Sequence, residues 1–131
     1  MDEQIDTYFD IHKYTKEESL TLEYCDLPIL KAIIDNTHLF THLKNLTIDT
    51  SGLKTFDICP PNLEKLDCSY NDLKMLSNLP DCLLTLQCFH NNIEQLDNLP
   101  QNLKKLYCNR NQITHLDNLP QGLIFLNCCH I

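Results

Sequence analysis

The sequence predicts an α/β solenoid, predominantly β: a right-handed curved coil with a parallel sheet on its concave face and short extended or turn segments on its convex face. Three observations predict this fold. From Pro60 onward the 131-residue chain repeats every 20 positions, each unit carries two leucines three residues apart, and a cysteine follows the second leucine by two positions. Such a period is typical of stacked coils, because no single unit can bury its apolar side alone.

The repeat unit reads L-x-x-L-x-C-x-x-N-x-[LI]-x-x-L-x-N-L-P-x-x. In the unit that begins at Leu63, a strand of period two points Leu66 and Cys68 inward and the intervening residue outward. Asn71 follows where the chain must turn, and we expect its amide to bond backbone groups that leave the sheet ladder. The same slots recur at Leu83, Leu86, Cys88 and Asn91, at Leu103, Leu106, Cys108 and Asn111, and at Leu123, Leu126 and Cys128.

Two weaker units precede the regular ones. The segment HLKNLTIDTSGLKTFDICP keeps the apolar slots and has Ser51 in place of the asparagine. One unit earlier, SLTLEYCDLPIL repeats the pattern, but the step from Leu20 to Leu46 is longer than the regular period. The extra residues place Leu30 and Ile33 at helical spacing, so we expect one short helix on the outside of the first coil. The shorter regular units leave no room for a helix.

We expect two segments in the chain. Residues 1–19 contain no repeat, combine acidic and apolar side chains, and are interpreted as an N-terminal cap over the first coil. Residues 20–131 form the repeat array, with about five coils plus a partial last one and no C-terminal cap. The apolar side of that last coil is therefore expected to be partly open.

Composition narrows the classes of partner. The chain has 10 basic and 18 acidic residues, a net charge of -8, which disfavours nucleic acid as a partner. No apolar run approaches the ~20 residues that cross a bilayer, and the acidic start does not look like a signal peptide. We therefore expect a cytoplasmic protein with no membrane partner.

The eight cysteines are interpreted as free thiols rather than as a disulfide framework. Four of them, Cys68, Cys88, Cys108 and Cys128, occupy an inward slot, and stacked side chains point the same way instead of toward each other. Cys59 and Cys25 also fall in repeat slots. Only Cys82 and Cys129 stand at variable positions, so these two are expected to be the more reactive thiols.

The repeat resembles the short leucine-rich repeats of bacterial type III effectors, and LPQNLKKLYCNRNQITHLDN shows the same order of slots. Its cysteine is similar to that of repeat proteins of large DNA viruses of amoebae. The resemblance covers about Leu20 to Ile131. It implies a protein-interaction module without the appended ubiquitin-ligase domain of the effectors, located in the host cytoplasm if the source is viral.

The outward residues of the strands are the candidate partner-binding site, because rigid strands hold variable side chains at fixed spacing. Aromatic and arginine side chains gather there, as they do at the centres of protein interfaces. The predicted site consists of Asp67, Ser69, Tyr70, Gln87, Phe89, His90, Tyr107, Asn109 and Arg110. For any one of these residues, a plain solvated strand position is the alternative.

Other functions remain as alternatives. A hydrolase would need a set of catalytic residues such as His90 with Cys129 or Asp67. Nothing in the sequence fixes the distances between these side chains. No cofactor or metal site is predicted, because Cys128, Cys129 and His130 are adjacent and no C-x-x-C pair completes them. A homodimer through the uncapped last coil, hiding Leu126, Cys128 and Ile131, is a further alternative, as is a truncated repeat protein without a dedicated partner.

Overall fold

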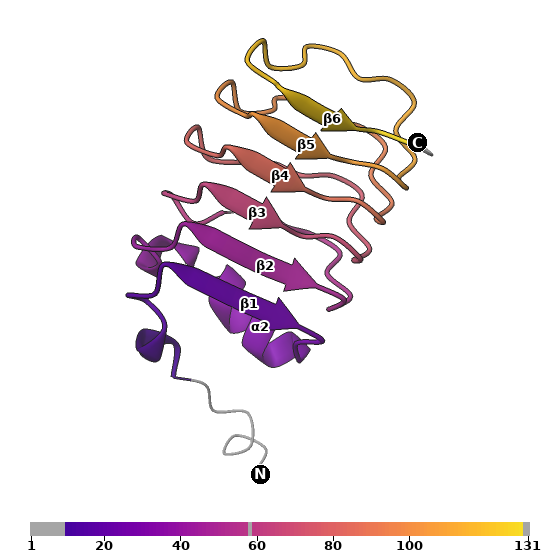
Figure 1. Cartoon of the computed structure of the whole chain (residues 1–131). Coiled ribbons are helices and arrows are strands. Elements are labelled where there is room, and N and C mark those ends of the chain that lie inside the picture. Colours follow the sequence, from indigo (N-terminus) through magenta and orange to yellow (C-terminus); the bar gives the residue numbers. More distant parts are fainter. Residues whose placement is uncertain (1–9, 58, 130–131) are drawn as a thin grey trace.

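A computed structural model describes residues 10–57 and 59–129 and shows one sheet of six parallel strands, arranged in sequence order (Figure 1). The strands are β1 (Ser19–Glu23), β2 (Asn45–Asp49), β3 (Lys65–Asp67), β4 (Thr85–Gln87), β5 (Lys105–Tyr107) and β6 (Phe125–Asn127). All six lie on one side of the molecule, and the return segments lie on the other. The predicted solenoid is confirmed.

The register of the sheet follows the repeat. Leu66 pairs with Leu46 on one side and with Leu86 on the other, and Leu106 pairs with Leu86 and Leu126. Because each of these steps is one repeat unit long, side chains of one slot lie above one another across the sheet. The step from β1 to β2 is longer, and there Leu20 still pairs with Leu46.

The core is a continuous stack of these inward slots. Leu46, Leu66, Leu86 and Leu106 are each at most 1% exposed, and the same holds for Leu43, Leu63, Leu83 and Leu103. The return segments contribute a second apolar stripe that includes Phe56, Leu73, Ile93 and Ile113. Each coil therefore buries its leucines against the coils before and after it.

All eight cysteines are free thiols, and the stacked ones lie where the sequence places them. Cys68, Cys88 and Cys108 are buried, Cys128 is half-buried, and Cys82 and Cys129 are exposed. Burial keeps the inner thiols protonated. It raises the pKa of Cys88 well above its ordinary value of 9.0, and raises the pKa of Cys108, with a smaller contribution from Cys128, to about 11.

Asparagine amides hold the turns after the strands. The Oδ1 of Asn91 accepts from the backbone N–H of Leu73 at 2.9 Å, and its Nδ2 donates to the carbonyls of Cys68 at 3.0 Å and Cys88 at 3.2 Å. Each amide thus bonds its own coil and the preceding one. Asn71 and Asn111 make equivalent bonds, which confirms the expected role of this slot.

The helix predicted in the first coil is α2 (Leu27–Ile34), which lies behind β1 and β2 (Figure 1) and buries Leu30 and Ile33. Two short 3-10 segments, η1 (Ile11–Lys13) and η2 (Thr37–Leu39), complete the helical elements of the described residues. None of these helices is long and apolar enough to span a bilayer. Pro28 in the first turn suits the helix start, since its missing N–H would have no helical partner there.

The two ends of the array differ. Ile11 and Tyr14 pack partly buried against the core beside the first coil. The rest of the proposed cap, residues 1–9, lies outside the described residues, and so do His130 and Ile131. At the other end Leu126 is 38% exposed, whereas Leu106, its equivalent in the preceding coil, is fully buried. The leucine of the last described strand is thus less buried than its equivalents in the preceding coils.

Replacing Asn91 by alanine should lower the free energy of unfolding by about 1–3 kcal/mol, because the buried Leu73 N–H loses its acceptor and the carbonyls of Cys68 and Cys88 each lose one of their two amide donors. Urea unfolding followed by circular dichroism measures this change. Asn92→Ala is the matched control, since no side-chain hydrogen bond of Asn92 is found among the described residues. Equal stability of the two variants would contradict a structural role for the amide.

The buried thiols should make the fold sensitive to alkali. Their folded pKa values lie above the unfolded value of 9.0, so their contribution is complete below pH 9 and is lost as pH rises toward the folded pKa, about 11 for Cys108. Each such thiol contributes up to ~1.4 kcal/mol of destabilisation per pH unit in that window. Urea midpoints at pH 8, 9 and 10 should fall less steeply for Cys88→Val than for the parent; parallel slopes would show that Cys88 ionises freely.

Candidate functional site

The candidate site is the solvent-facing side of the sheet, here called the strand face. It comprises the outward residues of the strands and the two residues that follow each strand. The structure places Asp67, Gln87 and Tyr107 half-buried in one row, Phe89 and Asn109 half-buried in the next, and Tyr70, His90 and Arg110 exposed in a third. Eight of the nine predicted site residues are therefore on this face.

Ser69 is the exception. Its side chain is 1% exposed, and its hydroxyl has no hydrogen-bond partner among the described residues. Ser69 is therefore not exposed to a partner, although Phe89 and Asn109, in the same slot of the next two coils, are half-buried. The backbone N–H of Ser69 donates to the Oδ1 of Asp67 at 3.0 Å.

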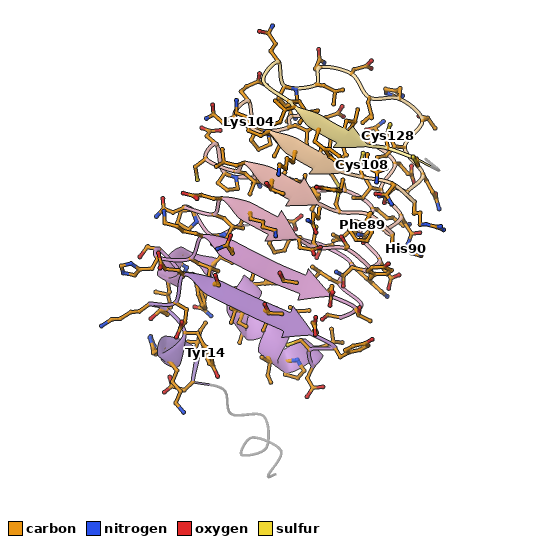
Figure 2. The ribbon with its side chains drawn as sticks, viewed as in Figure 1. Tyr14, Phe89, His90, Lys104, Cys108 and Cys128 are labelled. Atoms are coloured by element: carbon orange, nitrogen blue, oxygen red, sulfur yellow. The ribbon has the colours of Figure 1, made fainter. Side chains whose placement is uncertain are left out.

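Three aromatic rings meet at the carboxyl ends of β3 and β4. Tyr70 stacks on His90 with ring centroids 4.7 Å apart and meets Phe89 edge-on at 5.3 Å. Figure 2 shows Phe89 and His90 next to each other beyond the carboxyl end of β4. Lys104 lies on the other side of the sheet's strands, at their amino-terminal ends. Rings in these arrangements attract beyond their buried area, so the cluster presents one contiguous aromatic surface.

A second ring pair lies farther along the array, and the sequence analysis missed half of it. Tyr107 of β5 and Phe125 of β6 have centroids 4.7 Å apart, with planes tilted by 35°. Phe125 belongs to a further outward row, the residue before each strand leucine, which includes Lys65, Thr85 and Lys105. Period-two alternation about Leu126 would have found it.

Five residues after the strands adopt the left-handed backbone region, with φ between 48° and 60°: Tyr24, Thr50, Tyr70, His90 and Arg110. In each regular coil the N–H of this residue bonds the next coil, as from His90 to the carbonyl of Asn109 at 3.0 Å. Non-glycine residues are disfavoured there, by roughly 1–2 kcal/mol. A second slot with φ near 57° holds only asparagine, at Asn78, Asn98 and Asn118, the residue that tolerates this region best.

Charge is unevenly distributed over the strand face. Glu23, Asp49 and Asp67 lie on the first three strands, and the pKa of Asp49 is raised by partial burial and then by the neighbouring carboxylates of Glu23 and Asp67. Lys105 and Arg110 lie at the other end, on β5 and just after it. Lys65 of β3 also faces outward, so the face has more carboxylates than cations over β1–β3 and only cations over β5.

The hydrolase and metal-site alternatives are not supported by any arrangement of side chains in the described residues. His90 is engaged with the ring of Tyr70, and no hydrogen bond joins it to Asp67 or Cys129 within residues 10–57 and 59–129. In the same ranges, no three His, Cys, Asp or Glu side chains gather closely enough to hold a metal ion.

Solved structures place this fold among leucine-rich repeat domains. A Shigella effector LRR domain is 28% identical over 97% of this chain and 55% of its own, with a TM-score of 0.76. YopM from Yersinia enterocolitica WA-314 is 27% identical over 86% of this chain and 29% of its own, with a TM-score of 0.65. The chain thus spans about half of the first protein and under a third of the second.

No protein-family model matches the sequence, and no curated protein matches it. The similarity to repeat proteins of large DNA viruses stays a prediction. The resemblance to the leucine-rich repeats of bacterial effectors is confirmed by the structural neighbours: the chain has the architecture of their leucine-rich repeat domains.

Proposed function

We propose that the chain is a non-enzymatic protein-interaction module whose strand face binds a partner protein. The observation that carries this proposal is the identity of the left-handed residues on that face. Tyr70, His90 and Arg110 occupy a backbone conformation that asparagine or glycine would adopt at lower cost. Large side chains kept at strained positions point to a role outside the fold.

The composition of the face supports the same function. Tyr70, Phe89, His90 and Tyr107 supply rigid rings, and Arg110 supplies a planar cation, the residue types that dominate binding energy at protein interfaces. The strands hold these side chains on a short, hydrogen-bonded scaffold, so little order has to be gained on binding. The similar leucine-rich repeat domains include one described as that of an effector, which fits a binding module better than an enzyme.

Self-association is the second candidate, and the open last coil favours it. Ile124 is 75% exposed, Phe125 43% and Leu126 38%, and these three residues are consecutive at the outer edge of the sheet. A second copy that covered this coil would bury an apolar edge that the described chain leaves in water.

The double variant Tyr107→Thr with Arg110→Asn should lose partner binding by at least tenfold while remaining folded. Threonine keeps a strand-compatible side chain but loses the ring contact of Tyr107 with Phe125, whereas asparagine relieves the left-handed backbone strain at position 110. These two effects oppose each other, so the free energy of unfolding should change by no more than roughly 1 kcal/mol. Quantitative pull-down from lysate of the source cells, with parent and variant side by side, measures the loss.

The control for that experiment is Lys74→Ala, an exposed change in a return segment away from the strands. A partner captured equally by the parent, the control and the double variant would show that the strand face is not the binding surface. A lower free energy of unfolding for the single variant Arg110→Asn than for the parent would contradict the strain at Arg110.

Self-association has its own test. If a second copy covers the last coil, the parent should sediment as a dimer at high micromolar concentration, and Ile124→Asp should return it to a monomer. Analytical ultracentrifugation distinguishes the two. A parent that is monomeric throughout this range, with the same sedimentation coefficient as the variant, would remove this candidate.

A further inference from the structure

The basic residues of the strand face have no acidic partner within the fold. In the part of the chain that the structure describes, neither Lys105 nor Arg110 pairs with a carboxylate; the surface pairs found there are Lys31–Asp35, Lys44–Glu64 and His115–Asp117. Both side chains are exposed. They are available to an anionic group brought by another molecule.

The β5–β6 end of the array is basic, whereas the whole chain is acidic. The full sequence has 18 acidic and 10 basic residues, but residues 101–129 contain three cations, Lys104, Lys105 and Arg110, against one carboxylate, Asp117. The ammonium of Lys104 extends toward Gly122 of the next coil, so it too lies at this end. The reversal of sign is local.

An aromatic ring stands between Lys105 of β5 and Arg110 just after it. Tyr107 stands two residues beyond Lys105 on the same outward side of the strand, and its ring contacts Phe125. Arg110 follows three residues later, at the turn. The order along the chain is therefore cation, ring, cation, and Phe125 lies beside Lys105 on the neighbouring strand β6 with its ring against Tyr107.

We infer that the β5–β6 end of the strand face binds an acidic peptide segment of the partner, in which an apolar side chain stands between two carboxylates. This inference rests on the proposed function and specifies its partner. The apolar side chain packs on Tyr107 and Phe125, and the carboxylates face Lys105 and Arg110. Arginine suits this role because its planar guanidinium can hold a carboxylate with two parallel hydrogen bonds.

The acidic residues of the first strands set where such a segment can lie. Partial burial and then the carboxylates of Glu23 and Asp67 already raise the pKa of Asp49, so further carboxylates are disfavoured over β1–β3. Adjacent parallel strands are ~4.8 Å apart, which puts Asp67 on β3, the nearest of these carboxylates, roughly 10 Å from β5. That distance is somewhat longer than the Debye length of about 8 Å at physiological salt, so the repulsion of a bound carboxylate by Asp67 is weaker than its attraction to Lys105 and Arg110.

A nucleic acid is the competing anionic ligand, and the charge disfavours it. A phosphate backbone places charges continuously along its length, and its binding proteins cover a whole face with lysine and arginine. Here the few cations of the strand face, Lys65, Lys105 and Arg110, are separated from one another, and carboxylates outnumber cations over β1–β3. A segment with two carboxylates at a defined spacing fits better.

The test selects ligands without assuming a sequence. A phage-displayed library of random decapeptides is selected on the immobilised parent chain and on the charge-reversed variant Lys105→Glu with Arg110→Glu. The control variant, Lys54→Glu with Lys74→Glu, makes the same change in net charge at exposed positions in the return segments. Circular dichroism confirms that all three chains fold.

Peptides from the parent should be enriched at least fivefold in aspartate or glutamate beside leucine or an aromatic residue. The control should select the same peptides, and the charge-reversed variant should select lysine or arginine instead. Recovery of basic or neutral peptides by the parent, of no peptides at all, or of unchanged acidic peptides by the charge-reversed variant would overturn the inference. Tighter binding of a twelve-nucleotide oligodeoxythymidylate than of the selected peptide would also overturn it.

Failure of the inference and failure of the proposed function give different results. Basic or neutral peptides whose binding is lost in the variant Tyr107→Thr with Arg110→Asn would leave the strand face as the docking surface and refute only the acidic segment. Selected peptides that bind that variant as tightly as the parent would refute both.

Discussion

The structure depends on one repeated interaction, the bonding of an asparagine amide across two coils. Asn91 holds the Leu73 N–H of the preceding coil and the carbonyls of Cys68 and Cys88. Without this amide the Leu73 N–H would be buried without an acceptor, and the two carbonyls would each keep one donor, from Asn71 and from Asn111. Because the same bonds form at Asn71 and Asn111, coils this short can turn sharply and still stack in register. Ser51, which stands in the asparagine slot, makes fewer such bonds: its hydroxyl accepts from the Cys25 N–H at 3.1 Å.

Stacking in register has a consequence for the surface. Once the leucines and thiols of neighbouring coils lie above one another, the outward residues fall into rows that can vary without disturbing the core. The strand face uses this freedom: rings gather at the ends of β3 and β4, carboxylates over the first three strands, and cations on and after β5. The same turns force one residue per coil into the left-handed region, and in the regular coils those residues are Tyr70, His90 and Arg110 rather than asparagine. The left-handed position after each strand therefore serves both the turn of the coil and the proposed binding surface.

Most of the architecture could be predicted because residues one repeat unit apart in the sequence are neighbours across the sheet. Leu66 beside Leu86, the buried sulfurs of Cys68, Cys88 and Cys108, and the helix in the longer first coil all follow from it. Prediction was wrong at Ser69, which is buried although Phe89 and Asn109 in the same slot of the next coils are half-buried. The period assigns the slot but does not give the exposure of a small side chain among its neighbours. Prediction was incomplete at Phe125, whose contact with Tyr107 joins different slots of neighbouring coils.

The amino-acid pattern alone established the stacked coils, their register and their apolar interior, since a short fixed period with leucines in constant phase can be buried in only one way. Only the tertiary structure determined the backbone conformation, the ring contacts and the charge distribution of the strand face. The backbone conformation at Tyr70, His90 and Arg110 leaves no mark in the sequence, because no glycine or asparagine signals it there. The ring contacts and the separation of charge likewise arise between coils, where distance is set by the spacing of strands rather than by positions along the chain.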